Sequence, residues 1–233
     1  MSTEAGTGAP QPAEGENTPH DLAYRHTRRN LLSILTDRTE CADVPVPACP
    51  GWTVSDTVAH LVANCRQAER NLLGRPDHGR TPAGLAGMLS EWERSAAGVE
   101  RGIRRARSRL AGSVLVMDAF THEFDIRTAL GVSLPVWHAA TRSAFQMAVD
   151  GFGTAVSCLG RPPLRLETED GAWNVGSGAP SAVVFGTTHD LYRSLVGRRT
   201  AEQIGQLSWT AEPAPWIPAF TWGPFTPPVV RVE

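Results

Sequence analysis

The pattern of apolar and polar positions predicts long helices over the first two thirds of the chain. Apolar residues recur at helical spacing over residues 19–36, 53–73, 82–110, 113–130 and 135–159. Thr53 is a good N-cap for the second segment, and Asp56 three residues later can complete a capping box. A break is expected near Gly112. Long helices with short connections predict an antiparallel four-helix bundle.

The pattern changes after residue 160, where helical spacing gives way to short alternating segments. Residues 164–168 alternate between apolar and polar side chains, and residues 173–175 follow a turn signal at Gly171. Residues 182–185 resemble a third short strand, and a helix is expected from residue 187 to residue 196, before Gly197. The last thirty residues are rich in Pro and Trp and are expected to wrap the surface.

These patterns predict a mainly α protein with three parts. Residues 1–18 are rich in Gly, Pro and Thr and should form a disordered tail. Residues 19–160 should form the helical bundle, and residues 161–233 a small α+β domain. A unit of this size is marginal alone and should dock on the bundle.

Composition excludes several classes of function. Of 233 residues, 41% are hydrophobic and the formal net charge is −2, so no basic nucleic-acid-binding surface is expected. No window of 18 apolar residues is available to span a membrane. The N-terminus lacks the pattern of a signal peptide, which predicts a cytoplasmic protein. The four cysteines of the chain lack CxxC spacing and should stay reduced.

The segment 113–130 carries the first candidate chemistry. Asp118 and His122 lie four residues apart, on one face of a helix, and Asp125 continues that stripe. The helix is apolar nearly all round and should be buried, so these polar groups need partners. A metal ion, a plain Asp–His hydrogen bond or an arginine partner would each satisfy them, and the pattern leaves these alternatives open.

His60 lies on a polar stripe of the helix 53–73, together with Asp56, Asn64 and Gln67. This stripe either faces water or lines a polar cleft in which His60 is a third ligand. Asp56 would then orient the imidazole, or serve only as the helix cap. Two histidines and one carboxylate suit zinc or a similar divalent ion, and leave coordination positions open for a thiol or a water.

Two motifs resemble those of the DinB-like metalloproteins called the mycothiol-dependent maleylpyruvate isomerase family. They are CPGWTVSDTVAHL at residues 49–61 and MDAFTHEFDIRTALG at residues 117–131, and residues 170–204 look like the family's small C-terminal domain. The resemblance implies that His60, Asp118 and His122 hold zinc or another divalent metal. The acidic ligand is often Glu in this family, so Asp118 departs from the pattern. The family is typical of actinobacteria, which fits a chain without lysine.

The resemblance also implies an enzyme that uses mycothiol as its thiol cosubstrate. A metal-activated thiolate would attack an electrophilic small-molecule substrate, as an S-transferase or as a thiol-assisted cis–trans isomerase. A metal-dependent hydrolase is one alternative, and a non-catalytic small-molecule-binding or regulatory protein on the same bundle is another. Neither the substrate nor the oligomeric state follows from the sequence.

Several other residues carry weaker expectations. Arg198 and Arg199 follow Gly197 and would either grip an anionic group of substrate or thiol, or act as cations at the end of a helix. Glu123 points off the stripe of Asp118 and is expected to be structural. Cys49 is not expected to be a nucleophile, because its context offers no basic neighbour to lower its pKa.

Overall fold

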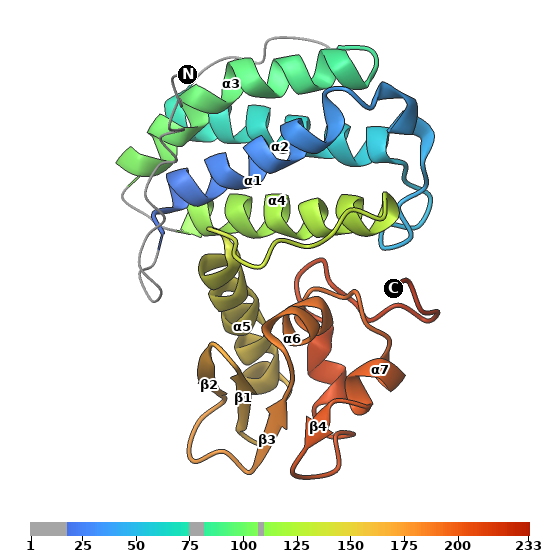
Figure 1. The fold of residues 1–233 in the computed structure, drawn as a ribbon. Helices are drawn as coiled ribbons and strands as arrows, with labels where there is room; N and C mark the ends of the chain where they lie inside the picture. Colours follow the sequence, from blue (N-terminus) through green and yellow to red (C-terminus); the bar gives the residue numbers. More distant parts are fainter. Residues whose placement is uncertain (1–17, 75–81, 107–109) are drawn as a thin grey trace, which may run out of the picture.

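The computed structural model describes residues 18–74, 82–106 and 110–233. Nearly all of the tail expected at residues 1–18 lies outside these ranges. Within them, four long helices pack as a bundle (Figure 1). Each packs against two neighbours in the cyclic order α1, α3, α2, α4. The helices are α1 His20–Leu35, α2 Val54–Leu73, α3 Leu85–Arg105 and α4 Leu110–Ala129. The predicted four-helix bundle is therefore confirmed.

The start of α2 is fixed by the predicted capping box. The Thr53 hydroxyl accepts a hydrogen bond from the Asp56 N–H at 3.2 Å, and the Asp56 carboxylate accepts one from the Thr53 N–H at 2.9 Å. Both bonds satisfy N–H groups that have no partner within the helix. Gly74 ends α2 in the left-handed conformation, with a φ of 64°. The register of His60 along the bundle follows from these two ends.

The break expected near Gly112 lies a few residues earlier, because α3 ends at Arg105 and α4 begins at Leu110 and continues through this glycine. A Cβ atom at Gly112 would lie 3.0 Å from Cγ2 of Ile103 and 3.2 Å from Cβ of His20. The glycine therefore permits close approach of α1 and α3 to the start of α4. Small size, and not a helix-ending conformation, explains the residue here.

The next helix, α5 (Thr141–Cys158), begins later than the expected residue 135. His138 holds the preceding loop on α4, because its Nε2 lies 2.9 Å from a Glu123 carboxylate oxygen and its Nδ1 accepts the Ala140 N–H at 3.0 Å. Glu123 is wholly buried, and it also accepts hydrogen bonds from Asn30 and Arg127. Its predicted structural role is in keeping with these contacts.

A small sheet with flanking helices forms the C-terminal part, as predicted. The strands occur in the order β2-β1-β3-β4, with β1 antiparallel to β2, parallel to β3, and β3 antiparallel to β4. The predicted strands and helix are β1 Leu164–Thr168, β2 Gly171–Val175, β3 Ala182–Phe185 and α6 Thr188–Leu195. The elements that were not predicted are α7 Ala201–Gly205, β4 Ser208–Trp209 and the 3-10 turns η1 Thr39–Asp43 and η2 Ile217–Phe220.

The last thirty residues do not simply wrap the surface. Trp216, Ala219 and Phe220 are buried, and the Phe220 ring lies 4.6 Å from the ring of Phe152 on α5. This segment is part of the core, because its aromatic side chains cover apolar faces that the short sheet leaves uncovered.

The C-terminal part reaches the bundle through α5 and α6 (Figure 1). The Tyr192 hydroxyl on α6 lies 2.7 Å from the Thr121 hydroxyl and donates to the Met117 carbonyl, both on α4. The middle of α4 therefore faces the C-terminal part. The domain boundary expected near residue 160 stays a prediction, because α5 packs against α4 and also against β2 and α6. Among the described residues, no helix is long and apolar enough to cross a membrane.

The packing of α5 on the C-terminal segment predicts that Gly151→Ala destabilises the protein. An added Cβ would lie 2.1 Å from Cζ3 of Trp222, whose indole N–H donates to the Leu195 carbonyl at the end of α6. We expect a loss of about 1–3 kcal/mol in the free energy of unfolding by urea, although alanine favours helix more than glycine does. Ser157→Ala, on the exposed face of α5, should change it by less than about 0.5 kcal/mol. Equal stability of Gly151→Ala and wild type would contradict the described packing.

Candidate metal centre

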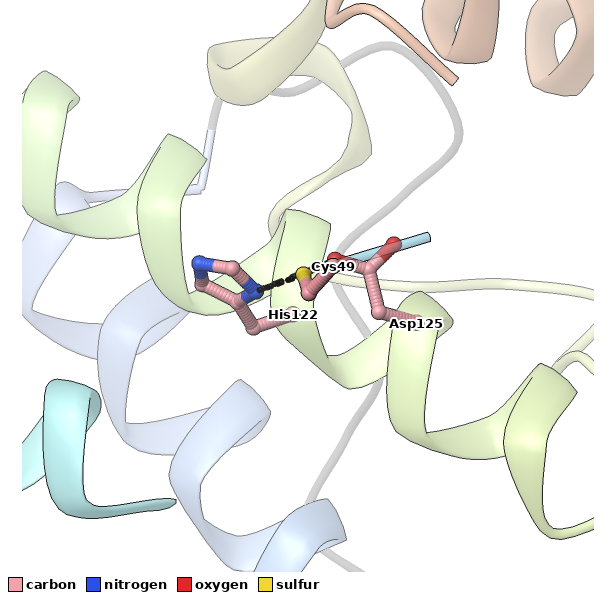
Figure 2. Close-up of side chains that lie close together, drawn as sticks. All are labelled: Cys49, His122 and Asp125. Carbon is pink, nitrogen blue, oxygen red and sulfur yellow. Dashed lines mark hydrogen bonds and ion pairs between the residues drawn. The ribbon is translucent and has the colours of Figure 1, made fainter. Parts of the chain in front are cut away.

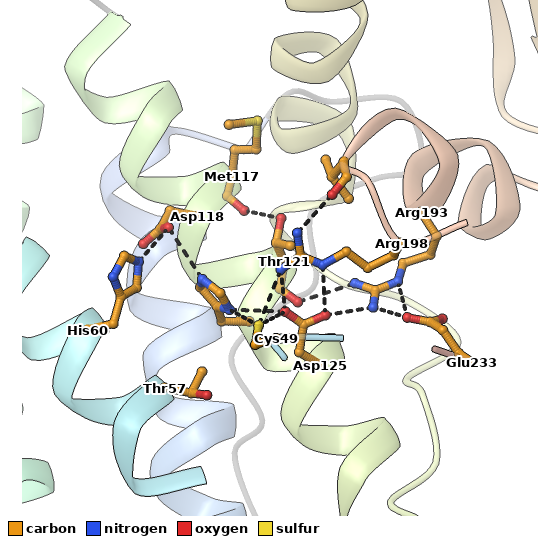
Figure 3. A network of polar contacts seen from close by, with 12 residues as sticks. Cys49, Thr57, His60, Met117, Asp118, Thr121, Asp125, Arg193, Arg198 and Glu233 are labelled. Carbon is orange, nitrogen blue, oxygen red and sulfur yellow. Dashed lines mark hydrogen bonds and ion pairs between the residues drawn. The ribbon is translucent and has the colours of Figure 1, made fainter. Parts of the chain in front are cut away.

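The structure brings His60, Asp118 and His122 together between α2 and α4. Figure 3 shows His60 facing Asp118. Nε2 of His60 lies 3.1 Å from Oδ1 of Asp118, and Nε2 of His122 lies 3.7 Å from the same oxygen. One ligand atom from each residue lies within 4.8 Å of the others. The spacing of four along α4 and the cap of α2 produce this convergence, which the sequence analysis expected.

The donor set fits a divalent ion of the zinc type. Tetrahedral bonds of about 2.0–2.1 Å separate neighbouring ligand atoms by about 3.3 Å, and the observed 3.1 and 3.7 Å lie on either side of that value. The side chains of His60 and Asp118 are 31% and 22% exposed, so an ion and a small molecule can reach them. Two imidazoles and one carboxylate leave part of a zinc coordination sphere for an exogenous ligand.

His60 and Asp118 each stabilise the charged form of the other. The hydrogen bond with Asp118 raises the pKa of His60, against the opposing effect of burial. Burial would raise the pKa of Asp118, but the hydrogen bond with His60 and the neighbouring His122 lower it overall. Asp118 is therefore a carboxylate at neutral pH, as a metal ligand must be.

The hydrogen bond made by Nδ1 of His122 determines whether Nε2 of the same ring is free to bind a metal ion. Nδ1 of His122 lies 3.0 Å from Oδ2 of Asp125, which is completely buried. An ionised carboxylate can only accept, so Nδ1 must carry the proton and donate it. Nε2 then keeps its lone pair on the side of His60 and Asp118. A carboxylate that holds a histidine in this way is typical of metal ligands.

Two arginines from the C-terminal part surround Asp125. Nη2 of Arg193 donates to Oδ1 at 2.6 Å, and Nη2 of Arg198 donates to Oδ2 at 2.7 Å. Burial alone would raise the pKa of Asp125, but the charges of Arg193 and Arg198 and the hydrogen bond from His122 hold it well below its usual value. The carboxylate is therefore charged at neutral pH, and both of its oxygens are engaged.

A second cluster, Cys49 with His122 and Asp125, has the residue types of a metal site but does not suit one (Figure 2). Sγ of Cys49 lies 3.8 Å from Nδ1 of His122 and 3.5 Å from Oδ2 of Asp125. A cation here would stand beside two buried guanidinium groups and would have to displace their hydrogen bonds to Asp125. The group on the other side of the His122 ring, with His60 and Asp118, is therefore the better candidate for a metal site.

The environment of Cys49 corrects one expectation from the sequence. The thiol does have a basic neighbour, because Nη2 of Arg198 lies 3.6 Å from its sulfur. Burial, followed by the charge of Asp125, nevertheless raises the pKa of Cys49 to about 12. That Cys49 is no nucleophile stays a prediction, and its physical reason is now burial beside a carboxylate.

Of the weaker candidates, Asn64 lies at the centre and Asp56 and Gln67 do not. The Asn64 amide donates to Oδ2 of Asp118 at 2.9 Å and lies 3.0 Å from Nε2 of His60. Asp56 is engaged in the cap of α2, as its alternative interpretation expected. Gln67 donates to Asn71 at 2.8 Å on the exposed side of the same helix.

The two arginines after Gly197 take different positions. Arg198 lies beside the centre, where it binds Asp125 and also donates to the carbonyl of Val196, the C-cap of α6. Arg199 binds Asp190 and Glu233 instead. Both guanidinium groups are engaged within the protein. Their role in binding an anionic group stays a prediction.

Sequence reasoning missed three residues around the centre. Trp52 lies over the ligands, with its ring 5.2 Å from the ring of His60 and nearly parallel to that of His122 at 6.1 Å. Arg193 and Glu233 complete the ionic network around Asp125. Trp52 belongs to the motif at residues 49–61 and could have been found there. No local signal indicates Arg193 or Glu233, because their partners lie 68 and 40 residues away.

Comparisons with known proteins agree with the expected resemblance. A family model described as the mycothiol maleylpyruvate isomerase N-terminal domain matches residues 23–127, which include all three proposed ligands. The resemblance is therefore confirmed for that part of the chain. No curated protein sequence matches. A crystal structure of a histidine-to-alanine mutant of mycothiol-dependent maleylpyruvate isomerase is 16% identical, with a TM-score of 0.46, over 87% of this chain and 94% of that one.

Replacement of the central carboxylate by Asp125→Asn should cost about 3–5 kcal/mol of unfolding free energy, because it leaves two buried guanidinium groups with too little negative charge. Because the folded pKa of Asp125 is lowered, its contribution is complete above the ordinary aspartate pKa of about 3.9 and fades as pH falls through the folded value. The difference from wild type in urea unfolding should thus be largest near neutrality and shrink in acid.

The control for this prediction is Glu167→Gln, which breaks an exposed pair with Arg165 and should cost at most about 1 kcal/mol. A loss for Asp125→Asn no greater than for the control, or one that does not change with pH, would contradict the described network.

Proposed function

We propose that the protein is a metal-dependent enzyme that uses mycothiol, because residues 23–127 match the family model of the mycothiol maleylpyruvate isomerase N-terminal domain. His60, Asp118 and His122 hold one divalent ion, with zinc the best match to the donor set. The reaction is a thiol-assisted cis–trans isomerisation of an electrophilic small molecule. The observation that supports it most is the convergence of these three side chains within the matched domain.

A bound divalent ion lowers the pKa of a thiol that reaches it, so that a thiolate is present at neutral pH. The chain's own residues prepare this site. Asp125 keeps the proton of His122 on Nδ1. Asn64 donates to Oδ2 of Asp118, which leaves Oδ1 beside both imidazoles. The ligands are therefore oriented before any small molecule binds, and this preorganisation lowers the cost of binding.

Trp52 contributes an apolar wall to the same site. Its ring lies beside both imidazoles, and the residue as a whole is 36% exposed, at the surface of the site. A flat aromatic face excludes water from one side of the thiol and lets a planar, conjugated substrate stack beside it. Electrostatic interactions of the thiolate and of the substrate are stronger where water is excluded.

The chemical step needs no oxidant or reductant. The mycothiol thiolate adds to one carbon of a conjugated cis double bond, and the electron pair of that bond moves toward the conjugated carbonyl. The former double bond then rotates as a single bond. Return of the electron pair restores the double bond in the trans form and expels the thiolate unchanged. An S-transferase would share the first step and keep the carbon–sulfur bond.

Reaction of zinc-loaded protein with maleylpyruvate and a small amount of mycothiol tests the proposal. We expect many substrate molecules to isomerise per thiol, with free mycothiol recovered at the end, as followed by chromatography and thiol titration. Asp118→Asn should lose at least about a hundredfold in rate, since it weakens a ligand. Asp150→Asn, an exposed residue of α5, should retain the wild-type rate.

Other outcomes identify the competing functions. Consumption of one thiol per product indicates an S-transferase, and turnover without thiol indicates a hydrolase. No turnover of any kind by protein that binds zinc and mycothiol would favour a binding or regulatory protein and would reject the isomerase.

A further inference from the structure

We propose that Arg193, held in place by Glu233, is a positioning residue through which the C-terminal part controls the metal-binding side of His122. This inference rests on the proposed function, because it assigns a role toward the same ion. Arg193 does not touch the proposed ligands. It acts on Asp125, which in turn acts on His122.

Arg193 lies at the centre of a buried ionic chain that runs from the bundle to the C-terminal tail (Figure 3). Its side chain is wholly buried, on α6. Its Nη2 donates to Oδ1 of Asp125 at 2.6 Å, and its Nε donates to Oε1 of Glu233 at 2.9 Å. Nη2 also contacts the same Glu233 oxygen. One guanidinium group thus joins two carboxylates from distant parts of the chain.

The two arginines make their shorter bonds to different oxygens of Asp125, which explains why both are present. Arg198 makes its shorter bond to Oδ2, the oxygen that also faces His122 and Cys49. Arg193 holds the opposite oxygen, Oδ1, at 2.6 Å, where Arg198 adds only a longer bond from its Nε at 3.3 Å. Without Arg193, Asp125 would keep short bonds at Oδ2 alone, and the carboxylate could rotate more freely about its Cβ–Cγ bond. Arg193 therefore fixes the plane in which Oδ2 meets Nδ1 of His122.

Glu233 is needed because two guanidinium groups share one aspartate. Three arginines, Arg193, Arg198 and Arg199, meet three acids, Asp125, Asp190 and Glu233, and the formal charges balance. Burial of an arginine is tolerated only where charges and hydrogen bonds are matched in this way. Without the Glu233 charge, Arg193 would be drawn away from Asp125 toward water.

The chain of contacts has a defined consequence at the metal centre. If Asp125 turns away, nothing holds the proton of His122 on Nδ1. The ring can then adopt the tautomer that carries its proton on Nε2, which cannot bind a metal ion. Loss of an outer-shell contact of this kind lowers metal affinity about ten- to a hundredfold in metalloproteins.

Two variants test the inference, each with zinc as the probe. Arg193→Lys keeps the charge but replaces the planar fork, which reaches Glu233 from Nε and Asp125 from Nη2, with a single ammonium group. Glu233→Gln keeps the shape but removes the charge. We expect each to weaken zinc binding about tenfold in competition with a chelator. In the zinc-free protein, long-range 1H–15N correlations should show His122 as the Nδ1–H tautomer in wild type and as a mixture in both variants.

Arg199→Gln is the matched control, because Arg199 shares the Glu233 partner and makes its own ion pairs with Glu233 and Asp190 alone. It should keep the zinc affinity of wild type. An equal loss in Arg199→Gln would mean that general loosening of the tail causes the effect, and would overturn the inference. Wild-type affinity and tautomer in both Arg193→Lys and Glu233→Gln would overturn it as well.

A double-mutant cycle separates positioning from other routes. In an Asp125→Asn background, Arg193→Lys should weaken zinc binding by less than about twofold further, because the link is already broken. A second full tenfold loss would show that Arg193 acts independently of Asp125, against the inference. Wild-type protein that binds no zinc would instead refute the proposed metal centre, while the tautomer of His122 in metal-free protein still decides the role of Arg193.

Discussion

The buried carboxylate of Asp125 determines how the rest of the site is arranged. It faces one imidazole, one thiol and two guanidinium groups, and none of its surface is exposed. Its charge is maintained by the arginines, and it in turn fixes the proton of His122 on Nδ1. The free nitrogen then points toward His60 and Asp118. Without this carboxylate, the same three side chains would be a histidine pair beside an aspartate, with no preferred tautomer.

The bundle and the C-terminal part contribute different residues to the site. The helices of the bundle supply the proposed ligands, because the cap of α2 sets the register of His60 and the four-residue spacing on α4 aligns Asp118 with His122. The C-terminal part supplies the positive charge that Asp125 needs. This explains why α6 packs on the middle of α4, where Tyr192 and Arg193 both contact it. The C-terminal part is thus coupled to the centre through charge, in addition to its apolar contacts.

Periodicity and spacing predicted the bundle, the hairpin with its third strand, and the shared helical face of Asp118 and His122, because each depends on contacts within a few residues or on a helical face. The set of three proposed ligands came from the family resemblance, since spacing alone left other partners open. The failures have a different origin. Gly112 was taken for a helix end, although it is a small residue in a tight contact with His20 and Ile103. The start of α5 depends on His138 binding Glu123, and the role of Arg193 depends on Asp125 and Glu233. Such contacts between distant segments leave no periodic signal in the sequence.

The side of the His122 ring on which an ion binds distinguishes the two candidate metal sites. Anomalous diffraction at the zinc edge, from crystals grown with one equivalent of zinc, would locate the ion. We expect one peak bonded to Nε2 of His60, Nε2 of His122 and a carboxylate oxygen of Asp118. A peak on the opposite side of the ring, bonded to Sγ of Cys49 and Nδ1 of His122, would contradict this expectation.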